Sequence, residues 1–226
     1  MTLWTWLKWG LGAGFLITGL GLDVMATPVN SELQAHVEEG KDTPVPPLFG
    51  VDPEDAENKG TATPGLLKID RVPNFHFNNV IASGLYQTEY ASNTNPYLQV
   101  SDFRGSLGGW SVSAKISDFV SKRTEEDTRA YLLSGATLTL HQGAVQEYDS
   151  VFAASPTSCN VTLNKQYQEV TGAVKGTGQG IWATRWPSSQ RVNHQIELSI
   201  LPETAQPGRN YEAIITWKLS DVPRSE

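Results

Sequence analysis

The side chains that most often carry catalysis or bind metals are few and scattered in this sequence. The four histidines and the single cysteine are His36, His76, His141, His194 and Cys159. No two of them have the short spacing of zinc ligands, and no Gly-x-Ser-x-Gly motif marks a nucleophilic serine. His194 lies on an apolar strand face, where a hydrogen-bonded core histidine is expected. The sequence therefore predicts no metal and no cofactor.

Two further segments have residue types that catalytic or cofactor sites use. Residues 125–127 read Glu-Glu-Asp, but glycoside hydrolysis needs two carboxyl groups at a defined separation, and a consecutive polar run is usually a solvated loop. Residues 176–180 read Gly-Thr-Gly-Gln-Gly, but a dinucleotide-binding loop opens a helix and no helical pattern follows here. We expect a hairpin turn at the glycines. The chain is thus predicted not to be an enzyme.

Tryptophan side chains are the best candidates for contacts with a ligand or partner. Beyond residue 26 they are Trp110, Trp182, Trp186 and Trp217. Two of them begin a Trp-x-aliphatic triplet, which ends at Val112 in one case and at Leu219 in the other. Because residues i and i+2 share one face of a strand about 7 Å apart, each triplet presents an indole beside an aliphatic group.

Two interpretations of these tryptophans remain open. They could be buried and lock neighbouring strands together, each burying roughly 150–250 Å². They could instead form an exposed aromatic shelf for sugar rings or for the apolar edge of a partner protein. Trp217 continues an apolar row, which favours burial, whereas Trp110 fits both interpretations. Trp182 and Trp186 lie near turn residues, where ligand contacts and packing over a sheet edge fit equally.

Alternating side chains predict the elements that hold these residues. Residues 192–200 place Val192, His194, Ile196, Leu198 and Ile200 on one face and polar residues on the other, the period of a half-buried strand. Similar patterns predict strands at 66–72, 97–103, 110–116, 137–141 and 211–219. Only residues 119–133 could hold a short helix. Such strands between glycine and proline turns predict an all-β fold, an antiparallel β-sandwich of immunoglobulin-like or barrel-like form.

The composition divides the chain into three parts. Residues 1–26 combine a basic start, a short uncharged run and a small-residue exit, which is typical of a signal peptide and too short for a confident membrane span of about 20 residues. Residues 27–63 are rich in proline, acidic and small polar residues, which predicts a flexible linker. Residues 64–223 form the expected domain, without a transmembrane segment. Because no sorting signal or lipidation cysteine is visible, we expect an exported protein that is either released or retained by binding.

The acidic composition limits the classes of partner. The formal net charge is −7 at pH 7, whereas nucleic acid binding needs clustered lysine and arginine. We therefore expect no nucleic acid partner. The same charge argues against simple electrostatic adhesion to anionic polymers, and it predicts that binding is only modestly sensitive to salt.

Three segments resemble the motifs of the WxL domain family of surface proteins from Gram-positive bacteria. The most specific covers residues 211–223, with a tyrosine, an Ile-Thr-Trp-Lys-Leu core and a proline. Residues 102–112 resemble the first motif of the family, and residues 66–77 resemble its opening strand. The first motif has Val112 where the family usually has leucine. The resemblance spans roughly residues 64–223.

The resemblance implies a secreted protein of the cell wall or cell surface, attached without a covalent bond. It implies binding of peptidoglycan or another wall glycan, and association with membrane-anchored surface proteins. The candidate contacts with ligand or partner are Trp110, Val112, Trp182, Trp186, Trp217 and Leu219. An alternative is an interaction subunit that docks on a membrane-anchored surface partner, by adding to an exposed sheet edge. A wall hydrolase is the least expected alternative.

Overall fold

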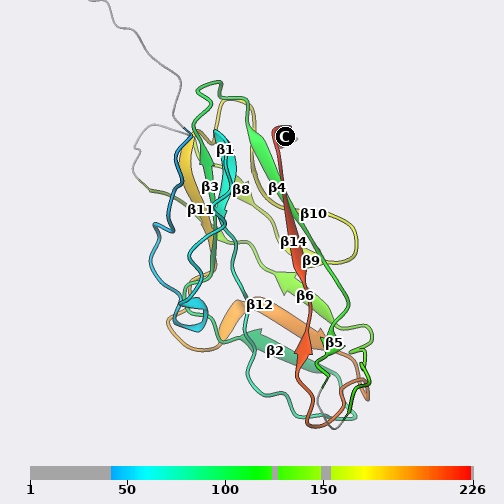
Figure 1. The fold of residues 1–226 in the computed structure, drawn as a ribbon. Coiled ribbons are helices and arrows are strands. Elements are labelled where there is room, and N and C mark those ends of the chain that lie inside the picture. Colours follow the sequence, from blue (N-terminus) through cyan, green and yellow to red (C-terminus); the bar gives the residue numbers. More distant parts are fainter. Residues whose placement is uncertain (1–41, 124–126, 149–153, 225–226) are drawn as a thin grey trace, which may run out of the picture. The chain divides into compact units, whose positions relative to one another are not determined.

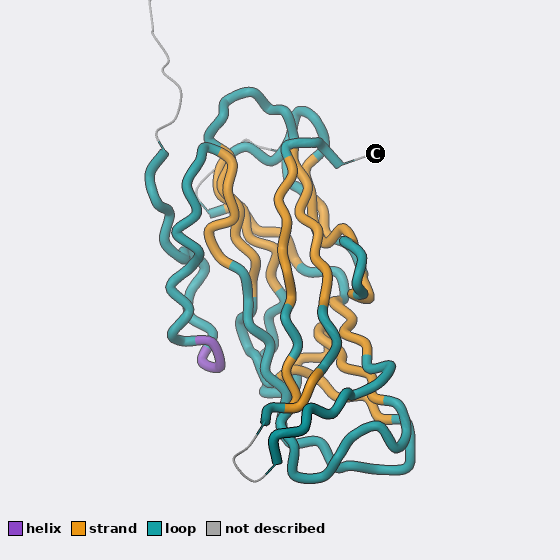
Figure 2. The backbone as a smooth tube through the Cα atoms, turned by 45° about the vertical axis from the view of Figure 1, so that its right-hand side comes forward, coloured by secondary structure: helices purple, strands orange, loops and turns teal. Residues whose placement is uncertain are grey.

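The computed structural model of the chain describes residues 42–123, 127–148 and 154–224, which have an all-β fold. Fourteen strands form four sheets whose pairings are all antiparallel, as the alternating side chains predict. None of these sheets closes into a barrel. Helical structure among the described residues is limited to one 3-10 turn, η1 (Pro53–Asp55), which is the purple turn in Figure 2.

Two four-stranded sheets contribute most of the core. Sheet A has the order β1–β3–β11–β7, and sheet C has the order β14–β4–β10–β8. Their strands are β1 (Leu67–Arg71), β3 (Tyr97–Asp102), β4 (Trp110–Ile116), β7 (Ala144–Glu147), β8 (Thr157–Ser158), β10 (Gln168–Ala173), β11 (Gly180–Arg185) and β14 (Ile215–Ser220). In Figure 1 the strands β1, β3 and β11 lie on one side, and β4 and β14 on the other. The inward side chains of both sheets meet in one buried cluster.

The remaining strands extend this core. Sheet B has the order β2 (Gln87–Ala91), β12 (Asn193–Ile200), β6 (Thr137–Leu140), β9 (Val161–Leu163), and a small sheet D pairs β13 (Tyr211–Glu212) with β5 (Val120–Ser121). Leu138, Leu140 and Ile196 of sheet B belong to the same buried cluster as the inward residues of sheets A and C. The three larger sheets therefore share one hydrophobic core, as a sandwich requires.

The alternation of apolar and polar residues in the sequence matches the burial pattern of β4. Its residues alternate between buried and half-buried along the whole strand, with Trp110, Val112, Ala114 and Ile116 on the buried side. All six strands predicted from the pattern occur within a few residues of their expected bounds. The segment predicted at 211–219 is divided into β13 and β14, and Ile214 between them is exposed.

The prediction for His194 is wrong. Its strand shifts register between Asn193 and Glu197, so that Asn193 is buried and His194 is exposed. Such a bulge moves side chains beyond it to the opposite face. The His194 ring instead lies 4.2 Å from the Tyr90 ring, measured between centroids, outside the core.

One expected turn and one possible helix also differ from the structure. The glycine-rich turn at 176–180 was expected to close a hairpin, but it connects β10 of sheet C to β11 of sheet A. In the region 119–133 the described residues form β5 and a bridge between Val120 and Leu132 rather than a helix. Tertiary pairing decided both cases, since neither segment carries a strong local signal.

The expected linker is packed against the domain where the structure describes it, at residues 42–63, which we call the covering segment. The backbone of Leu48 donates to the Gln99 side chain at 3.0 Å, and the Tyr97 hydroxyl donates to the Gly50 carbonyl at 3.2 Å. Phe49 packs edge-on against Tyr97 with ring centroids 5.8 Å apart. Since Tyr97 and Gln99 lie on the outward face of β3, the covering segment buries that face of sheet A.

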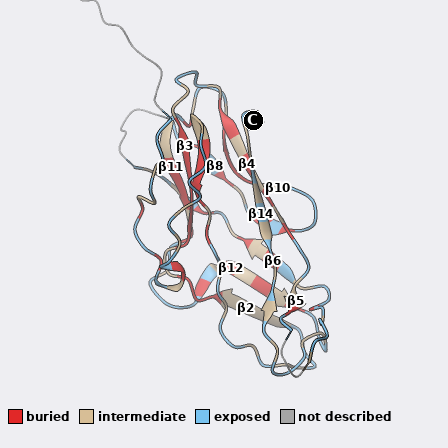
Figure 3. Cartoon of the chain, viewed as in Figure 1, coloured by how far each residue is buried: buried red, intermediate tan, exposed pale blue. Residues whose placement is uncertain are grey.

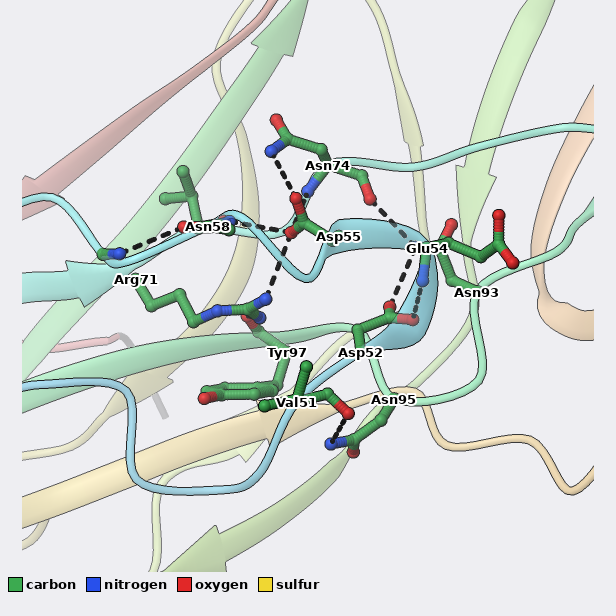
Figure 4. Close-up of polar contacts among 12 residues, drawn as sticks. Val51, Asp52, Glu54, Asp55, Asn58, Arg71, Asn74, Asn93, Asn95 and Tyr97 are labelled. Atoms are coloured by element: carbon green, nitrogen blue, oxygen red, sulfur yellow. Dashed lines mark hydrogen bonds and ion pairs between the residues drawn. The ribbon is translucent and has the colours of Figure 1, made fainter.

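A polar network holds the covering segment in place (Figure 4). The Asp55 carboxylate accepts from Arg71 at 3.1 Å, from Asn58 at 2.7 Å and from Asn74 at 2.7 Å. The Asp52 carboxylate accepts from the Asn93 amide at 2.8 Å. The composition predicts a linker here because a segment rich in proline, acidic and small polar residues buries too little apolar surface to offset its ordering entropy. Here each buried charge has hydrogen-bond partners, which offset the cost of desolvation.

Candidate binding surfaces

The two Trp-x-aliphatic triplets lie on neighbouring strands. β14 pairs with β4 over its whole length, and the register places Trp217 opposite Ala114 and Leu219 opposite Val112. Directly opposite residues of an antiparallel pair point to the same face of the sheet. Both triplets therefore direct their side chains to the inward face of sheet C.

Trp110 is a core residue. Its side chain is 1% exposed, and its indole nitrogen donates to the Gly178 carbonyl at 2.9 Å. Gly178 has a φ of +78°, and a Cβ there would lie 2.3 Å from the Ala173 Cβ and 2.8 Å from the indole nitrogen. Only glycine fits this position. The turn at residues 176–180, which was considered as a nucleotide-binding loop, therefore packs against the Trp110 indole and accepts its hydrogen bond.

The other two buried tryptophans belong to or follow strand β11. Trp182 is 3% exposed and donates from its indole nitrogen to the Gln179 carbonyl at 2.9 Å. Trp186 is fully buried, donates to the His141 carbonyl at 2.7 Å and packs edge-on against Phe75. Each indole therefore has the hydrogen-bond partner that a buried N–H requires.

Four of the six candidate contact residues are thus packing residues. Trp110, Val112, Trp182 and Trp186 are at most 3% exposed, so their side chains offer no surface to a ligand in this structure. Figure 3 shows red, buried positions along β4 and β11, whereas β14 has none. Of the predicted site, Trp217 and Leu219 remain accessible, because β14 is the last strand of its sheet.

Trp217 and Leu219 line an open groove between the edges of two sheets. The groove has a volume of about 630 Å³, and its other wall is formed by Leu67 and Ile69 of β1 with Thr63 beside them. Trp217 and Leu219 are half-buried and pack against the main core. In this groove, inward-facing side chains of sheet C are accessible from the surface.

A second surface lies on the outward face of sheet C and was not predicted. The exposed ring of Tyr167, in the loop between β9 and β10, has the ammonium of Lys115 at 4.9 Å and that of Lys218 at 5.7 Å from its centroid. We call these three residues the Tyr167 surface. Within the described residues neither ammonium has a carboxylate at ion-pair distance, whereas nearby Lys165 pairs with Asp118 and Arg224 pairs with Glu169. The outward-facing lysines were visible in the alternation, but nothing in the sequence placed a loop tyrosine between them.

The acidic cluster has no feature of a reaction centre in the part that the structure describes. Glu125 and Glu126 lie outside the described residues. The Asp127 carboxylate accepts from Arg129 at 3.1 Å and from the Tyr131 hydroxyl at 2.9 Å, and it contacts Arg209. The hydrogen bonds from Arg129 hold the pKa of the Asp127 carboxyl well below its usual range. Such a carboxylate stays ionised and is unsuited to act as a general acid.

Neither a metal-binding cluster nor a membrane-spanning helix is found among the described residues. Within 42–123, 127–148 and 154–224, no group of three or more histidine, cysteine, aspartate or glutamate side chains could hold a metal ion. In the same ranges, no helix has the length and apolar character needed to cross a membrane.

The comparisons with known proteins identify the family. The profile described as "WxL domain surface cell wall-binding" matches residues 25–223, nearly the whole chain. A search of curated proteins and a search of solved structures each gave no match. The match includes both Trp-x-aliphatic strands and the covering segment, which agrees with a domain that begins before residue 64. The chain therefore belongs to the WxL domain family, and it is a cell-surface protein that binds the cell wall.

Proposed function

We propose that this protein binds peptidoglycan through the Tyr167 surface, and that it acts by adhesion without hydrolysis. Family membership supports wall binding but does not name the ligand. The observation that carries the proposal is the pair of unpaired ammonium groups beside an exposed aromatic ring. Peptidoglycan presents sugar rings next to short peptides with free carboxylates, and the Tyr167 surface offers a complement to both.

The charge distribution supports this surface over other exposed faces. The protein as a whole carries a formal net charge of −7, so an anionic ligand needs a local group of cations to offset the overall repulsion. Lys115 and Lys218 lie on adjacent strands and converge on one ring. Because their charges are not neutralised by neighbouring carboxylates in the described structure, they remain available to a ligand.

Sedimentation with purified peptidoglycan sacculi tests the proposal. We expect the full chain to pellet with sacculi, and the double variant Lys115→Ala/Lys218→Ala and the single variant Tyr167→Ala each to bind about tenfold more weakly, a loss of about 1.4 kcal/mol. Lys59→Ala and Tyr86→Ala are matched controls. Both residues are exposed and lie off sheet C, in the covering segment and before β2. These controls should pellet like the unchanged protein.

The salt dependence and the fate of the sacculi complete this test. With two cations in contact, binding should weaken only modestly between low and physiological salt. Sacculi incubated with the protein should release no soluble sugar. Wild-type protein that stays in the supernatant would overturn peptidoglycan binding, and equal losses in the test and control variants would overturn the Tyr167 surface.

A second candidate function is docking on a membrane-anchored surface protein. The specific observation in its favour is the groove beside β14, since neither edge strand that flanks it pairs across it. The lining combines apolar side chains with Lys218, Ser220 and Asp221, and the addition of a strand at a sheet edge is an established mode of peptide recognition. Sedimentation of the protein with membranes that lack wall material tests this function separately from binding to sacculi.

A further inference from the structure

The edge of β14 exposes backbone groups that can pair with another strand. β14 pairs only with β4 among the described residues, so one side of the strand has no strand partner. The Ser117 amide donates to the Ile214 carbonyl, which identifies Ser117 and Ile214 as a hydrogen-bonded pair of the two strands. In an antiparallel ladder, hydrogen-bonded pairs recur at every second residue. Thr216, Lys218 and Ser220 therefore bond to β4, while Ile215, Trp217 and Leu219 direct their N–H and C=O groups to the open edge.

The same residues supply the apolar wall of the groove. Trp217 and Leu219 line it from β14, and Leu67 and Ile69 line it from β1. Their spacing of two residues repeats every 6–7 Å, which is the repeat of side chains on one face of a strand. A bound strand could thus form backbone hydrogen bonds and insert alternate apolar side chains at the same time.

We propose that the groove accepts an extended segment of a partner protein, which pairs with β14 as a fifth strand of sheet C. This inference deepens the docking function proposed above and rests on it. A glycan has no backbone that could match three donor–acceptor pairs at strand spacing, whereas a peptide strand does. The partner segment has apolar side chains at alternate positions facing Trp217 and Leu219.

Charge specifies the other face of the partner segment. A strand added beside β14 places its polar residues on the outward face of the sheet, next to Thr216, Lys218 and Ser220. The ammonium of Lys218 has no carboxylate at ion-pair distance in the described structure. An acidic side chain opposite Lys218 would complement it, and opposite charges on facing strands favour pairing. The proposed ligand is therefore an alternating apolar and polar strand with an acid at one outward position.

Hydrogen exchange of the full chain tests the proposal with a defined probe. The probe is an eight-residue peptide in which valine alternates with threonine, with glutamate at the fourth position. At saturating peptide, exchange at the amides of Ile215, Trp217 and Leu219 should slow about tenfold or more. The amides of Thr216, Lys218 and Ser220 already bond to β4 and serve as internal controls that should change little.

N-methylated peptides separate strand pairing from simple filling of the groove. One peptide carries N-methyl groups on its valines and a second carries them on its polar residues, so that each blocks one edge of the strand. One of the two should bind about tenfold or more weakly, because two or more hydrogen bonds are lost. The other should bind nearly as well as the parent peptide. Equal effects of both would overturn the proposal.

Protein variants locate the binding to the groove. Leu67→Arg places a long cation in the groove and should abolish peptide binding, while Ile214→Arg adds the same side chain at an exposed position outside it. Thermal unfolding shows whether Leu67→Arg remains folded. If Leu67→Arg unfolds, the variant Thr63→Arg at the exposed rim of the groove is used in its place. Thr63→Arg should weaken peptide binding at least tenfold.

The remaining outcomes assign the groove to something else. Absence of protection at any peptide concentration up to the millimolar range overturns the proposal. Protection of the same amides by soluble peptidoglycan fragments, or by raising the protein concentration alone, assigns the groove to glycan or to a second copy and also overturns it. If Leu67→Arg still sediments with membranes, docking stands and strand pairing fails. If the unchanged protein does not sediment with membranes, the docking function itself fails.

Discussion

At the residue scale, the tryptophans differ in role although two of them share one sequence pattern. Trp110 is 1% exposed with a hydrogen-bonded indole, whereas Trp217 is half-buried and lines a groove. The reason is position in the sheet: β4 is covered on both sides by neighbouring strands and β14 on only one. The residue pattern within one strand does not show whether the strand lies inside a sheet or at its edge, so it does not predict which tryptophan is buried.

Replacing each of these two tryptophans by alanine should separate the two roles. Trp110→Ala should destabilise the protein by about 3–5 kcal/mol, because it creates a cavity in the core and leaves the Gly178 carbonyl without its donor. Trp217→Ala should cost less, about 1–3 kcal/mol, because its side chain is only partly buried and already contacts water in the native state. Urea unfolding measures both values. Equal costs would contradict the difference in burial.

The buried carboxyl group of Asp70 makes stability depend on pH. Burial raises the pKa of Asp70, although hydrogen bonds from Ser101 at 2.6 Å and Gln99 at 3.2 Å and the charge of Lys68 act in the opposite direction. An acid whose pKa is raised on folding favours the native state when it is protonated. Its contribution is present below the usual pKa and is lost as the pH rises through the pKa of the folded state.

The variant Asp70→Asn should reveal this contribution because it keeps an acceptor oxygen but cannot ionise. The free energy of unfolding of the variant, relative to the unchanged protein, should increase from about pH 3 to about pH 7. Urea unfolding at the two values of pH provides the measurement, and taking the difference removes the effects of other groups. A relative stability that falls over this range would mean that the hydrogen bonds outweigh burial.

At the element scale, the covering segment changes where the domain begins. Residues 42–63 supply Phe49, Asp52 and Asp55 to buried positions on or beside sheet A. Without them, the outward side chains of β1 and β3 would lose their partners, among them Arg71, which is 1% exposed. The linker predicted at residues 27–63 therefore does not match the contacts of residues 42–63, and its first part, residues 27–41, lies outside the described residues.

Truncation tests this boundary. Protein that starts at residue 42 should keep a cooperative unfolding transition, because it retains the whole covering segment. Protein that starts at residue 64 should lack a cooperative unfolding transition, because the outward face of sheet A around Tyr97 and Ala183 would lose its apolar contacts with the covering segment. Circular dichroism during thermal unfolding provides the comparison.

A milder change probes the same contact without removing the segment. Asp55→Ala leaves Arg71 unpaired and should cost about 3–5 kcal/mol. Glu57→Ala, at an exposed position two residues away, is the matched control and should cost little. Cooperative unfolding of the protein from residue 64 at the original midpoint would show that the segment is dispensable.

At the scale of the whole molecule, the two surfaces proposed for binding lie on one sheet. The Tyr167 surface lies on the outward face of sheet C, and the groove lies at its β14 edge. Lys218 contributes its ammonium to the first surface, and its strand provides one wall of the second. Because both proposals use the ammonium of Lys218, a partner strand with an acid opposite Lys218 should compete with the wall ligand for this group.

The sequence alone determined the fold class, because the side chains of a half-buried strand alternate whatever its neighbours are. It also determined family membership, through local motifs at residues 66–77, 102–112 and 211–223. These features depend on residues close together in the chain, and they were predicted correctly.

Only the tertiary structure decided which residues reach the surface. Strand order puts β14 at an edge and β4 inside, and it brings Tyr167 to Lys115 and Lys218 from separate parts of the chain. It also made Asp55 and Asp52, which were expected in a linker, buried partners of Arg71 and Asn93. Burial depends on contacts between residues distant in sequence, and the alternation within a single strand carries no information about them.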